Sequence, residues 1–362
     1  MPTNDFLPFA TDVAANLISQ SAYAALPARG AGFSSGLAKS AEANKVWRQA
    51  NTMSAMLGKY IQDFGPLDAL DNGDIQTLEN NFHMALVMGT TRKWVLSQDL
   101  TLYVNPTTGN DANDGKTTAT AFRTIQTAIN SLYWFYDLGG YNVVIKLAAG
   151  TYNYNVNGST AAIFYGMPEG ARPFGITIRG EPLAQETVVI NATNSNCMHC
   201  AFGVSINIDG IRFQSSGSVW TPVLAQGASL TVHQNSWAKI TNCTFATSGQ
   251  LQIWVLRASV VTIEGNNNKF SGGGVWCCIA QETGLVYSQN TVITYVGNPT
   301  YTYNMAAQYV GMVWLEGVTF VGTVVGLRYI VSANGNIQTI GAGPNYIPGT
   351  IAGSASSGGN YF

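Results

Sequence analysis

"IDGIRF" at residues 208–213 opens a series of similar stretches in this chain of 362 residues. The later members are "ITNCTF" at 240–245, "IEGNNNKF" at 263–270, the weaker "SQNTVITY" at 288–295 and "LEGVTF" at 315–320. Each ends on an aromatic residue, and the successive spacings are 32, 25, 25 and 25 residues for Phe213, Phe245, Phe270, Tyr295 and Phe320. A period in this range is typical of stacked repeat architectures.

The pattern within each stretch selects one of these architectures. Apolar and polar residues alternate, Asn and Gly supply turns, and we expect only strands from about residue 176 onward. This favours a parallel β-helix in which each copy is one coil, with Ile208, Ile211 and Phe213 stacked on their counterparts about 4.8 Å away. The alternative is a β-sandwich, which gives strands about every 8–12 residues without the longer period.

The first 98 residues have a different, helical pattern. Residues 40–64 carry apolar side chains with gaps of 4, 3, 4, 3 and 4, a heptad seam made of Val46, Ala50, Met53, Leu57, Tyr60 and Phe64. Such a seam either packs within its own domain or joins several chains, and the spacing leaves both open. A second helix is expected from about Asp74 to Met88, with Asp74 as its cap.

The remaining segments divide the chain further. Residues 99–155 read as a strand, a polar loop, an amphipathic helix at 122–136 placed to cap the first coil, and a second strand. Near the C-terminus we expect Tyr329–Ser332 and Ile337–Ile340 to pair as a hairpin about Asn334-Gly335. The predicted regions are therefore helical at 1–98, the start of the β-helix at 99–155, the β-helix body at 156–325, and a C-terminal hairpin, cap and tail at 326–362.

Composition excludes several classes of function. Charged residues make up 10% of the chain and the net charge is −2, with Lys and Arg scattered, so nucleic-acid binding is not expected. No apolar run approaches the roughly 20 residues that cross a bilayer, and the N-terminus lacks a signal-peptide pattern. These features predict a soluble protein that is made in a cytoplasm and does not insert into membranes.

Two stretches have the spacing of partial metal sites. Cys197-Met-His-Cys200 has the spacing of half a zinc site, but no second pair follows, and the other histidines are His83 and His233. The loop with Asp111 and Asp114 lacks the EF-hand register. We therefore expect buried thiols and a solvated turn, with no metal and no cofactor.

Three acids occupy one position of the repeat. Asp209, Glu264 and Glu316 each lie directly before Gly, and Thr241 and Gln289 occupy that position in the coils between them. Acids two coils apart lie about 9.5 Å from each other, the outer limit for an inverting glycosidase pair. If the protein is an enzyme, these are its candidate catalytic residues. The alternative is an ordinary solvent-facing turn, and we assign no catalytic residue.

Alternation also predicts three tryptophans on the outer surface. Leu251, Ile253 and Val255 should point inward and leave Trp254 outside. The same reasoning takes Val275, Cys277 and Ile279 as inward, and likewise Val313 and Leu315, leaving Trp276, Trp314 and Glu316 outward. Outward tryptophans either form a carbohydrate-binding surface or are buried between chains of an oligomer.

Three stretches resemble parts of known families. "KSAEANKVWRQ", within "ANLISQSAYAA…GKYI" and followed by "DNGDIQTLENNFHMAL", is similar to the N-terminal region of tailed-bacteriophage tail fibres and tailspikes. "LYVNPTTGNDANDGKTTATAFRTIQTAIN…VVIKLAAGTY" resembles the opening of pectate-lyase-like right-handed β-helix domains. "GLRYIVSANGNIQTIGAG…YIPG" is similar to the C-terminal end of some tail fibres.

The resemblance implies a homotrimer of right-handed parallel β-helices with a small helical N-terminal region. That region would bind the phage tail, baseplate or an adaptor protein, and the β-helix would recognise bacterial surface polysaccharide during adsorption. The protein would belong to the virion and be assembled in the host cytoplasm. Two other functions stay open: a tailspike depolymerase, acting as glycosidase or lyase, and a structural adaptor for a second fibre.

Overall fold

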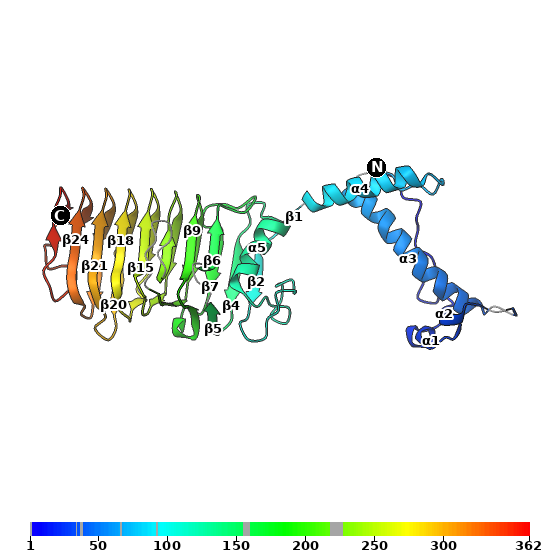
Figure 1. Ribbon diagram of the computed structural model, residues 1–362, viewed down its shortest axis with the longest axis horizontal. Helices are drawn as coiled ribbons and strands as arrows, with labels where there is room; N and C mark the ends of the chain where they lie inside the picture. Colours follow the sequence, from blue (N-terminus) through cyan, green and yellow to red (C-terminus); the bar gives the residue numbers. More distant parts are fainter. Residues whose placement is uncertain are drawn as a thin grey trace. The chain divides into compact units, whose positions relative to one another are not determined.

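The computed structural model describes residues 2–33, 35–36, 39–65, 67–91, 93–154, 160–217 and 227–362. The chain forms two compact units, Met1–Lys93 and Trp94–Phe362. The first is helical and the second consists of stacked strands, as Figure 1 shows. The predicted boundary after residue 98 lies inside the second unit, because the strand at Trp94–Val95 pairs with Tyr136–Asp137.

The helical unit is built on two long helices and a short N-terminal strap. Its helices are α1 (Gln20–Ala24), α2 (Ala28–Ala31), α3 (Ser40–Phe64) and α4 (Ile75–Thr91). The two long helices occur where the sequence predicts them, and Asp74 Oδ1 accepts the Thr77 N–H at 3.1 Å as the cap of α4. The small core centres on Ile61, Ala69 and Ala85. None of the described helices is long and apolar enough to cross a membrane.

The second unit is a parallel β-helix with three long sheets. All strand pairs in the described part of this unit are parallel, which rules out the β-sandwich. The ten-stranded sheet contains β2 (Leu100–Val104), β4 (Val143–Leu147), β7 (Ile176–Arg179), β10 (Ser205–Asp209), β13 (Trp237–Thr241), β16 (Val260–Glu264), β19 (Leu285–Gln289), β22 (Met312–Glu316), β25 (Asn336–Gln338) and β27 (Asn360–Tyr361).

The other sheets supply the remaining sides of each coil. The seven-stranded sheet contains β5 (Gly150–Tyr154), β8 (Val188–Ala192), β11 (Arg212–Ser215), β14 (Thr244–Phe245), β17 (Asn268–Phe270), β20 (Val292–Tyr295) and β23 (Thr319–Val321). The eight-stranded sheet contains β6 (Thr160–Tyr165), β9 (Asn196–Ala201), β12 (Ala228–Val232), β15 (Leu251–Leu256), β18 (Gly274–Gln281), β21 (Thr300–Gln308), β24 (Val325–Ser332) and β26 (Ser354–Ala355). A two-stranded sheet pairs β1 (Trp94–Val95) with β3 (Tyr136–Asp137), and a 3₁₀ turn covers Gln185–Thr187.

The repeating aromatics form a stack inside the coils. Phe213, Phe245, Phe270 and Tyr295 are in register, and successive ring centroids lie 5.3, 5.1 and 5.7 Å apart. Phe320 departs from the predicted alignment, because its backbone pairs with Ile293 while its ring stacks on Tyr295 at 6.1 Å. The stack confirms that one sequence repeat is one coil.

The first coil is closed by α5 (Ile125–Phe135), which lies against the β-helix end in Figure 1. Its side chains Ile125, Ile129 and Leu132 are buried, and so are Phe122 just before the helix and Tyr136 just after it. The Thr124 hydroxyl accepts the Thr127 N–H at 3.2 Å and starts the helix. The open edge of the stack is thereby covered.

The predicted C-terminal hairpin is wrong. β24 pairs in parallel with β21 and β26, and β25 pairs in parallel with β22 and β27, so the two segments lie in different sheets. The turn between them contains Ala333 and Asn334 at φ 50° and 59°, and it rotates the chain from one sheet to the next. Asn-Gly marks a turn in either fold, and only the pairing distinguishes a hairpin from a coil corner.

Candidate functional site

The outward face of the ten-stranded sheet gathers most of the predicted site. Strand pairing places Asp209, Thr241 and Glu264 in one row, and Gln289 with Glu316 in its continuation. This confirms the alignment that the repeat predicts. We call this row, together with the parallel row through Asn207, Lys239, Thr262, Tyr287, Trp314 and Gln338, the long-sheet face.

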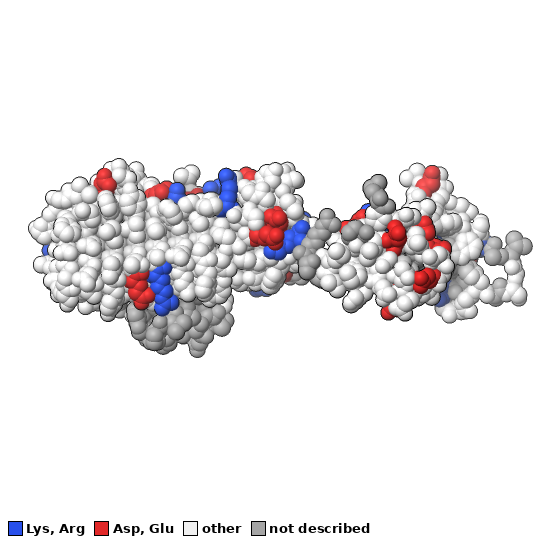
Figure 2. All heavy atoms as spheres, turned by 90° about the horizontal axis from the view of Figure 1, so that it is seen from above, with Lys and Arg blue, Asp and Glu red and all other residues white. Residues whose placement is uncertain are grey.

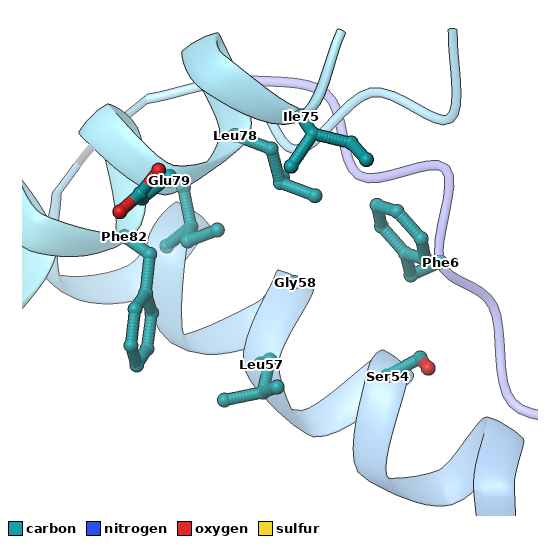
Figure 3. A pocket seen from close by; sticks show the side chains of 9 residues that line it. Phe6, Ser54, Leu57, Gly58, Ile75, Leu78, Glu79 and Phe82 are labelled. Carbon is teal, nitrogen blue, oxygen red and sulfur yellow. The ribbon is translucent and has the colours of Figure 1, made fainter. Parts of the chain in front are cut away.

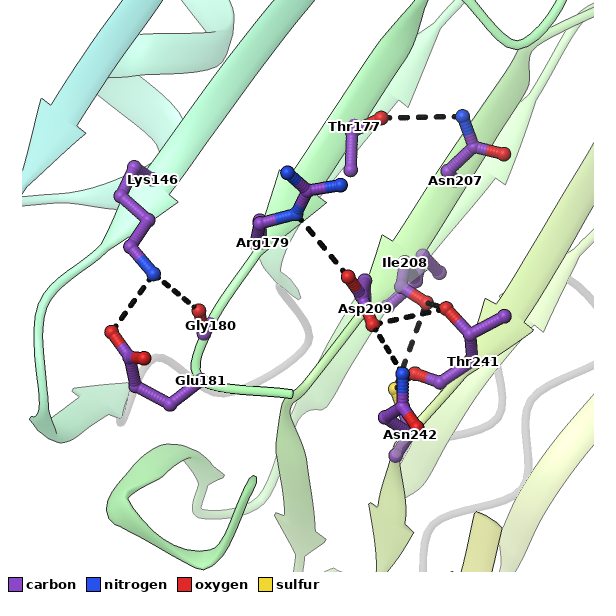
Figure 4. A network of polar contacts seen from close by, with 11 residues as sticks. Lys146, Thr177, Arg179, Gly180, Glu181, Asn207, Ile208, Asp209, Thr241 and Asn242 are labelled. Carbon is purple, nitrogen blue, oxygen red and sulfur yellow. Dashed lines mark hydrogen bonds and ion pairs between the residues drawn. The ribbon is translucent and has the colours of Figure 1, made fainter. Parts of the chain in front are cut away.

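Asp209 is held in a network of polar contacts (Figure 4). Its carboxylate forms an ion pair with Arg179 Nε at 3.2 Å and accepts hydrogen bonds from Thr241 Oγ1 at 3.0 Å and Asn242 Nδ2 at 2.9 Å. Both carboxylate oxygens therefore have protein partners, which come from the coil before and the coil after that of Asp209. This arrangement fastens coils together, and it leaves Asp209 poorly placed for proton transfer to a ligand.

The other two acids of the row have fewer partners. Lys239 Nζ lies 3.2 Å from Glu264 Oε1, and the Trp314 indole N–H donates to Glu316 Oε2 at 3.3 Å. The strand register separates the two acids by one intervening coil, at Gln289, which gives about 9.5 Å at β-sheet spacing. Their catalytic role stays a prediction.

Aromatic side chains accompany these acids on the long-sheet face. Trp314 lies one coil from Tyr287, with ring centroids 6.4 Å apart, and the Tyr287 hydroxyl donates to Gln289 Oε1 at 2.7 Å. Trp237, in the next outward row of the same sheet, is 43% exposed, and its indole N–H donates to Thr262 Oγ1 at 2.9 Å. Tyr287 and Trp237 were not among the predicted outward aromatics, although the alternation of apolar and polar residues in "LVYSQ" and "WAKIT" indicates their orientation.

Trp254 and Trp276 do not belong to this face. They lie on β15 and β18 of the eight-stranded sheet, so the predicted carbohydrate-binding set is divided between two sides of the β-helix. Trp254 is only 6% exposed, and its indole N–H donates to Gln281 Oε1 at 2.9 Å. Trp276 is half-buried and stacks on Tyr303 with centroids 4.1 Å apart.

The inward set predicted for β18 was right for Cys277, which lies in the main core, and wrong for Ile279. Pairing aligns Cys278 with Ile253 of the core and Ile279 with Trp254, so Ile279 is not the inward residue of this strand. The run from Val275 to Ile279 is apolar at every position. A period of two therefore has no polar residues by which to identify the outward side.

A histidine pair lies on the eight-stranded sheet. His199 and His233 come from successive coils, their rings stack with centroids 4.4 Å apart, and their Nε2 atoms are hydrogen-bonded to each other. Burial lowers the pKa of His199 to about 3 and that of His233 to about 4. Both rings are therefore neutral at pH 7. The sequence alone did not pair these two residues, which lie 34 positions apart in the chain.

The cysteines of the zinc-like motif are packed in the core. Cys197 and Cys200 are both free and buried, and burial raises the pKa of Cys197 to about 12. A buried protonated thiol is a poor metal ligand. The two acids of the polar loop are also engaged: Asp111 Oδ1 accepts the Arg123 and Thr124 N–H groups, and Asp114 Oδ1 accepts the Lys116 N–H.

The heptad seam of α3 divides into two parts. Tyr60 and Phe64 pack against the small core of the helical unit, as the single-domain alternative predicts. Met53 and Leu57 are 57% and 40% exposed, and Ala50 is exposed as well. Val46 at the start of the seam is half-buried. The described residues of the same unit therefore cover the middle of the seam, from Ala50 to Leu57, only in part.

An apolar pocket of about 270 Å³ opens beside this exposed part (Figure 3). Leu57 contributes one wall, Phe6 of the N-terminal strap a second, and α4 the third, through Ile75, Leu78 and Phe82. Gly58 lies at the floor, where an added Cβ would meet Asn4 Oδ1 at 2.4 Å. The strap can cross α3 here because no side chain is present.

Comparisons with known proteins give a distant likeness of fold. No family model matches the chain, and no curated protein matches it either. Among solved structures, a deglycosylated pectin methylesterase from Aspergillus niger is 14% identical over 75% of this chain and 85% of that chain, with a TM-score of 0.41. The pectin methylesterase from Erwinia chrysanthemi is 12% identical over 64% and 78%, with a TM-score of 0.34. These matches concern the parallel β-helix and nothing beyond it.

Proposed function

We propose that this chain is a phage tail fibre or tailspike, a virion structural protein whose β-helix recognises bacterial surface polysaccharide during adsorption. The observation that carries the proposal is the long-sheet face, where Trp314, Tyr287 and Glu316 project together from successive coils. An aromatic face beside a carboxylate is suited to a sugar, because the ring packs on the apolar side of a pyranose and the acid accepts its hydroxyl protons.

The proposal includes a homotrimer that is joined in part through α3. The exposed Met53 and Leu57 support it, since a heptad seam that its own chain covers only in part is stabilised when helices of several chains pack along it. The open pocket next to Leu57 offers further apolar surface to a neighbouring chain. The helical unit would also attach to the tail, and the protein would be assembled in the host cytoplasm before it joins the virion.

Sedimentation or native mass measurement tests the trimer directly. The full chain should have three times the mass of one 38.6-kDa polypeptide. Leu57→Glu should dissociate it, because three carboxylates would be buried together in the seam. Thr52→Glu is the matched control, since Thr52 is exposed on the same helix away from the seam. A monomer in the unmodified protein contradicts the proposed assembly.

Polysaccharide recognition is tested with purified lipopolysaccharides and capsules on a surface. The full chain should bind a subset of them, and Trp314→Ala should weaken that binding. Release of reducing sugars from a bound polymer would instead favour the depolymerase, in which case Glu264→Gln or Glu316→Gln should abolish the release. Failure of a folded protein to bind any member of a broad panel would argue for the structural adaptor.

A further inference from the structure

The β-helix becomes almost uncharged toward its C-terminal end. Residues 283–362 contain two charged residues in the sequence, Glu316 and Arg328. Arg328 lies on β24 of the eight-stranded sheet, so Glu316 is the charged residue that this stretch contributes to the long-sheet face. In Figure 2 the end of the β-helix that carries the C-terminus is nearly free of red and blue atoms.

The cations that the rest of the long-sheet face carries already have partners. Lys146 Nζ lies 2.8 Å from Glu181 Oε1, and Lys239 lies 3.2 Å from Glu264. Arg179 is paired with Asp209 within the network of Figure 4. Each of these cations joins neighbouring coils or a turn to its coil. A ligand that formed an ion pair with one of these cations would have to break a contact that stabilises the β-helix.

A negatively charged polymer would therefore meet an unsuitable surface here. Next to Trp314 it would encounter the Glu316 carboxylate, and the described cations of the same face are neutralised by protein acids. Like charges in contact cost binding energy, and sites for anionic sugars or phosphates are usually built with Arg or Lys that can pair with them. The polar side chains near Trp314 are instead the amides of Gln289 and Gln338.

We infer that the long-sheet face around Trp314, Tyr287 and Glu316 takes a neutral polysaccharide, made of hexoses or N-acetylated amino sugars without carboxylate, phosphate or sulfate groups at the contacting units. This inference rests on the proposed function and specifies its substrate class. Glu316 accepts sugar hydroxyls, the amides donate and accept, and the aromatic pair packs against the ring faces.

The experiment uses the full chain and two sets of immobilised bacterial polysaccharides of known repeat unit, one neutral and one containing uronic acids or phosphates. Binding should be confined to the neutral set and change less than about twofold between low and high salt, because screened charge contacts contribute little. Trp314→Ala should weaken it about tenfold. Trp134→Ala is the control, since Trp134 is exposed on α5 at the far end of the solenoid.

A reversal of charge sharpens the test. Glu316→Lys should gain salt-sensitive binding to the anionic set, because it places an unpaired cation beside Trp314. Binding of the unmodified chain to the anionic set alone would overturn the inference and leave the proposed function standing. If Trp314→Ala left the binding unchanged, the binding site would not lie on the long-sheet face around Trp314, and the inference would be overturned. Absence of binding to both sets by a folded protein would overturn the inference and the proposed function together.

Discussion

The two units of this protein bury their apolar side chains in different ways. In the β-helix, inward residues stack on inward residues of the next coil, and large side chains such as Phe213 and Phe245 are fully covered. In the helical unit the core is small, and Met53 and Leu57 remain open to solvent. A solenoid is stabilised by its own repetition, whereas a pair of helices needs either a larger core or a partner.

Substitutions in the two units should therefore affect stability to different extents. A change inside the β-helix removes contacts with two neighbouring coils, so its effect on the free energy of unfolding is large. A change in the helical unit acts on a few contacts or on association with other chains. The four predictions below test this contrast, beginning with the largest expected effect.

Phe245→Ala should destabilise the β-helix by about 3–5 kcal/mol, the usual cost of removing a buried aromatic ring. Its ring lies between those of Phe213 and Phe270, so the substitution leaves a cavity in the middle of the stack. Denaturant unfolding followed by hydrogen exchange should show faster exchange in peptides of the neighbouring coils. Phe135→Ala is the control, because Phe135 is half-exposed on α5.

If Phe245→Ala and Phe135→Ala protected the amides around the aromatic stack from exchange equally well, the contrast between the units would be contradicted. A loss of protection confined to one coil would also contradict the contrast, because the Phe245 ring contacts the coils on both sides and both should lose protection. Peptides from the helical unit should keep their exchange rates in Phe245→Ala, and a change there would show that the units do not unfold separately.

Gly58→Leu should destabilise the helical unit by about 1–3 kcal/mol, because added volume displaces a well-packed segment. A Cβ at this position would meet Asn4 Oδ1 at 2.4 Å and Phe6 Cβ at 3.2 Å. The strap should then leave α3 and become sensitive to proteases. Gly30→Leu is the matched control, since a Cβ at Gly30 meets no atom within 4 Å. Equal cleavage rates would contradict the predicted contact of the strap.

The sequence predicts the stacking of the β-helix better than it predicts which side of each strand faces outward, and the reason is physical. Repetition of one pattern every 25 residues indicates stacking, and the acids Asp209, Glu264 and Glu316 were aligned correctly by that repeat alone. Which side of a strand faces outward depends on alternation. Where the strand is apolar throughout, as from Val275 to Ile279, alternation carries no signal and the assignment failed.

Contacts between residues that lie far apart in the chain could not be predicted from the sequence, for a different reason. The hairpin at Asn334-Gly335 was predicted from local turn chemistry, but the parallel partners of β24 and β25 lie one coil away in the chain. The pair of His199 and His233 depends on the exact length of the coil between them. A single sequence gives the number of residues in that coil, but it does not show how they divide between strands and turns. It therefore does not show which residues of successive coils lie side by side.

Acidification should weaken the β-helix through this histidine pair. Burial lowers the pKa values of His199 and His233 to about 3 and 4, so between pH 6.5 and 4 the unfolded chain binds more protons than the folded one. Stability should therefore fall as the pH is lowered, by about 1 kcal/mol per pH unit from the buried His199 and by a smaller, solvent-screened amount from the half-buried His233. Urea midpoints measured from pH 7 to pH 4.5 check this.

His199→Gln should flatten the pH dependence, because a non-titrating side chain replaces the buried imidazole. His83→Gln is the control, since His83 is exposed in the helical unit. A slope that His199→Gln leaves unchanged would assign the pH dependence to other groups. A loss of stability that occurs in the helical unit first would contradict the assignment to the β-helix.

The smallest effect is expected from surface ion pairs, and it should be similar in both units. A double-mutant cycle of Asp209→Asn and Arg179→Gln should give a coupling energy of about 0.5–1 kcal/mol, since Arg179 is partly exposed. The pair of Lys59 and Asp63 on α3 should give about 0.3–0.5 kcal/mol. A coupling of several kcal/mol at Asp209 would show that its polar network, and not the aromatic stack alone, holds the coils together.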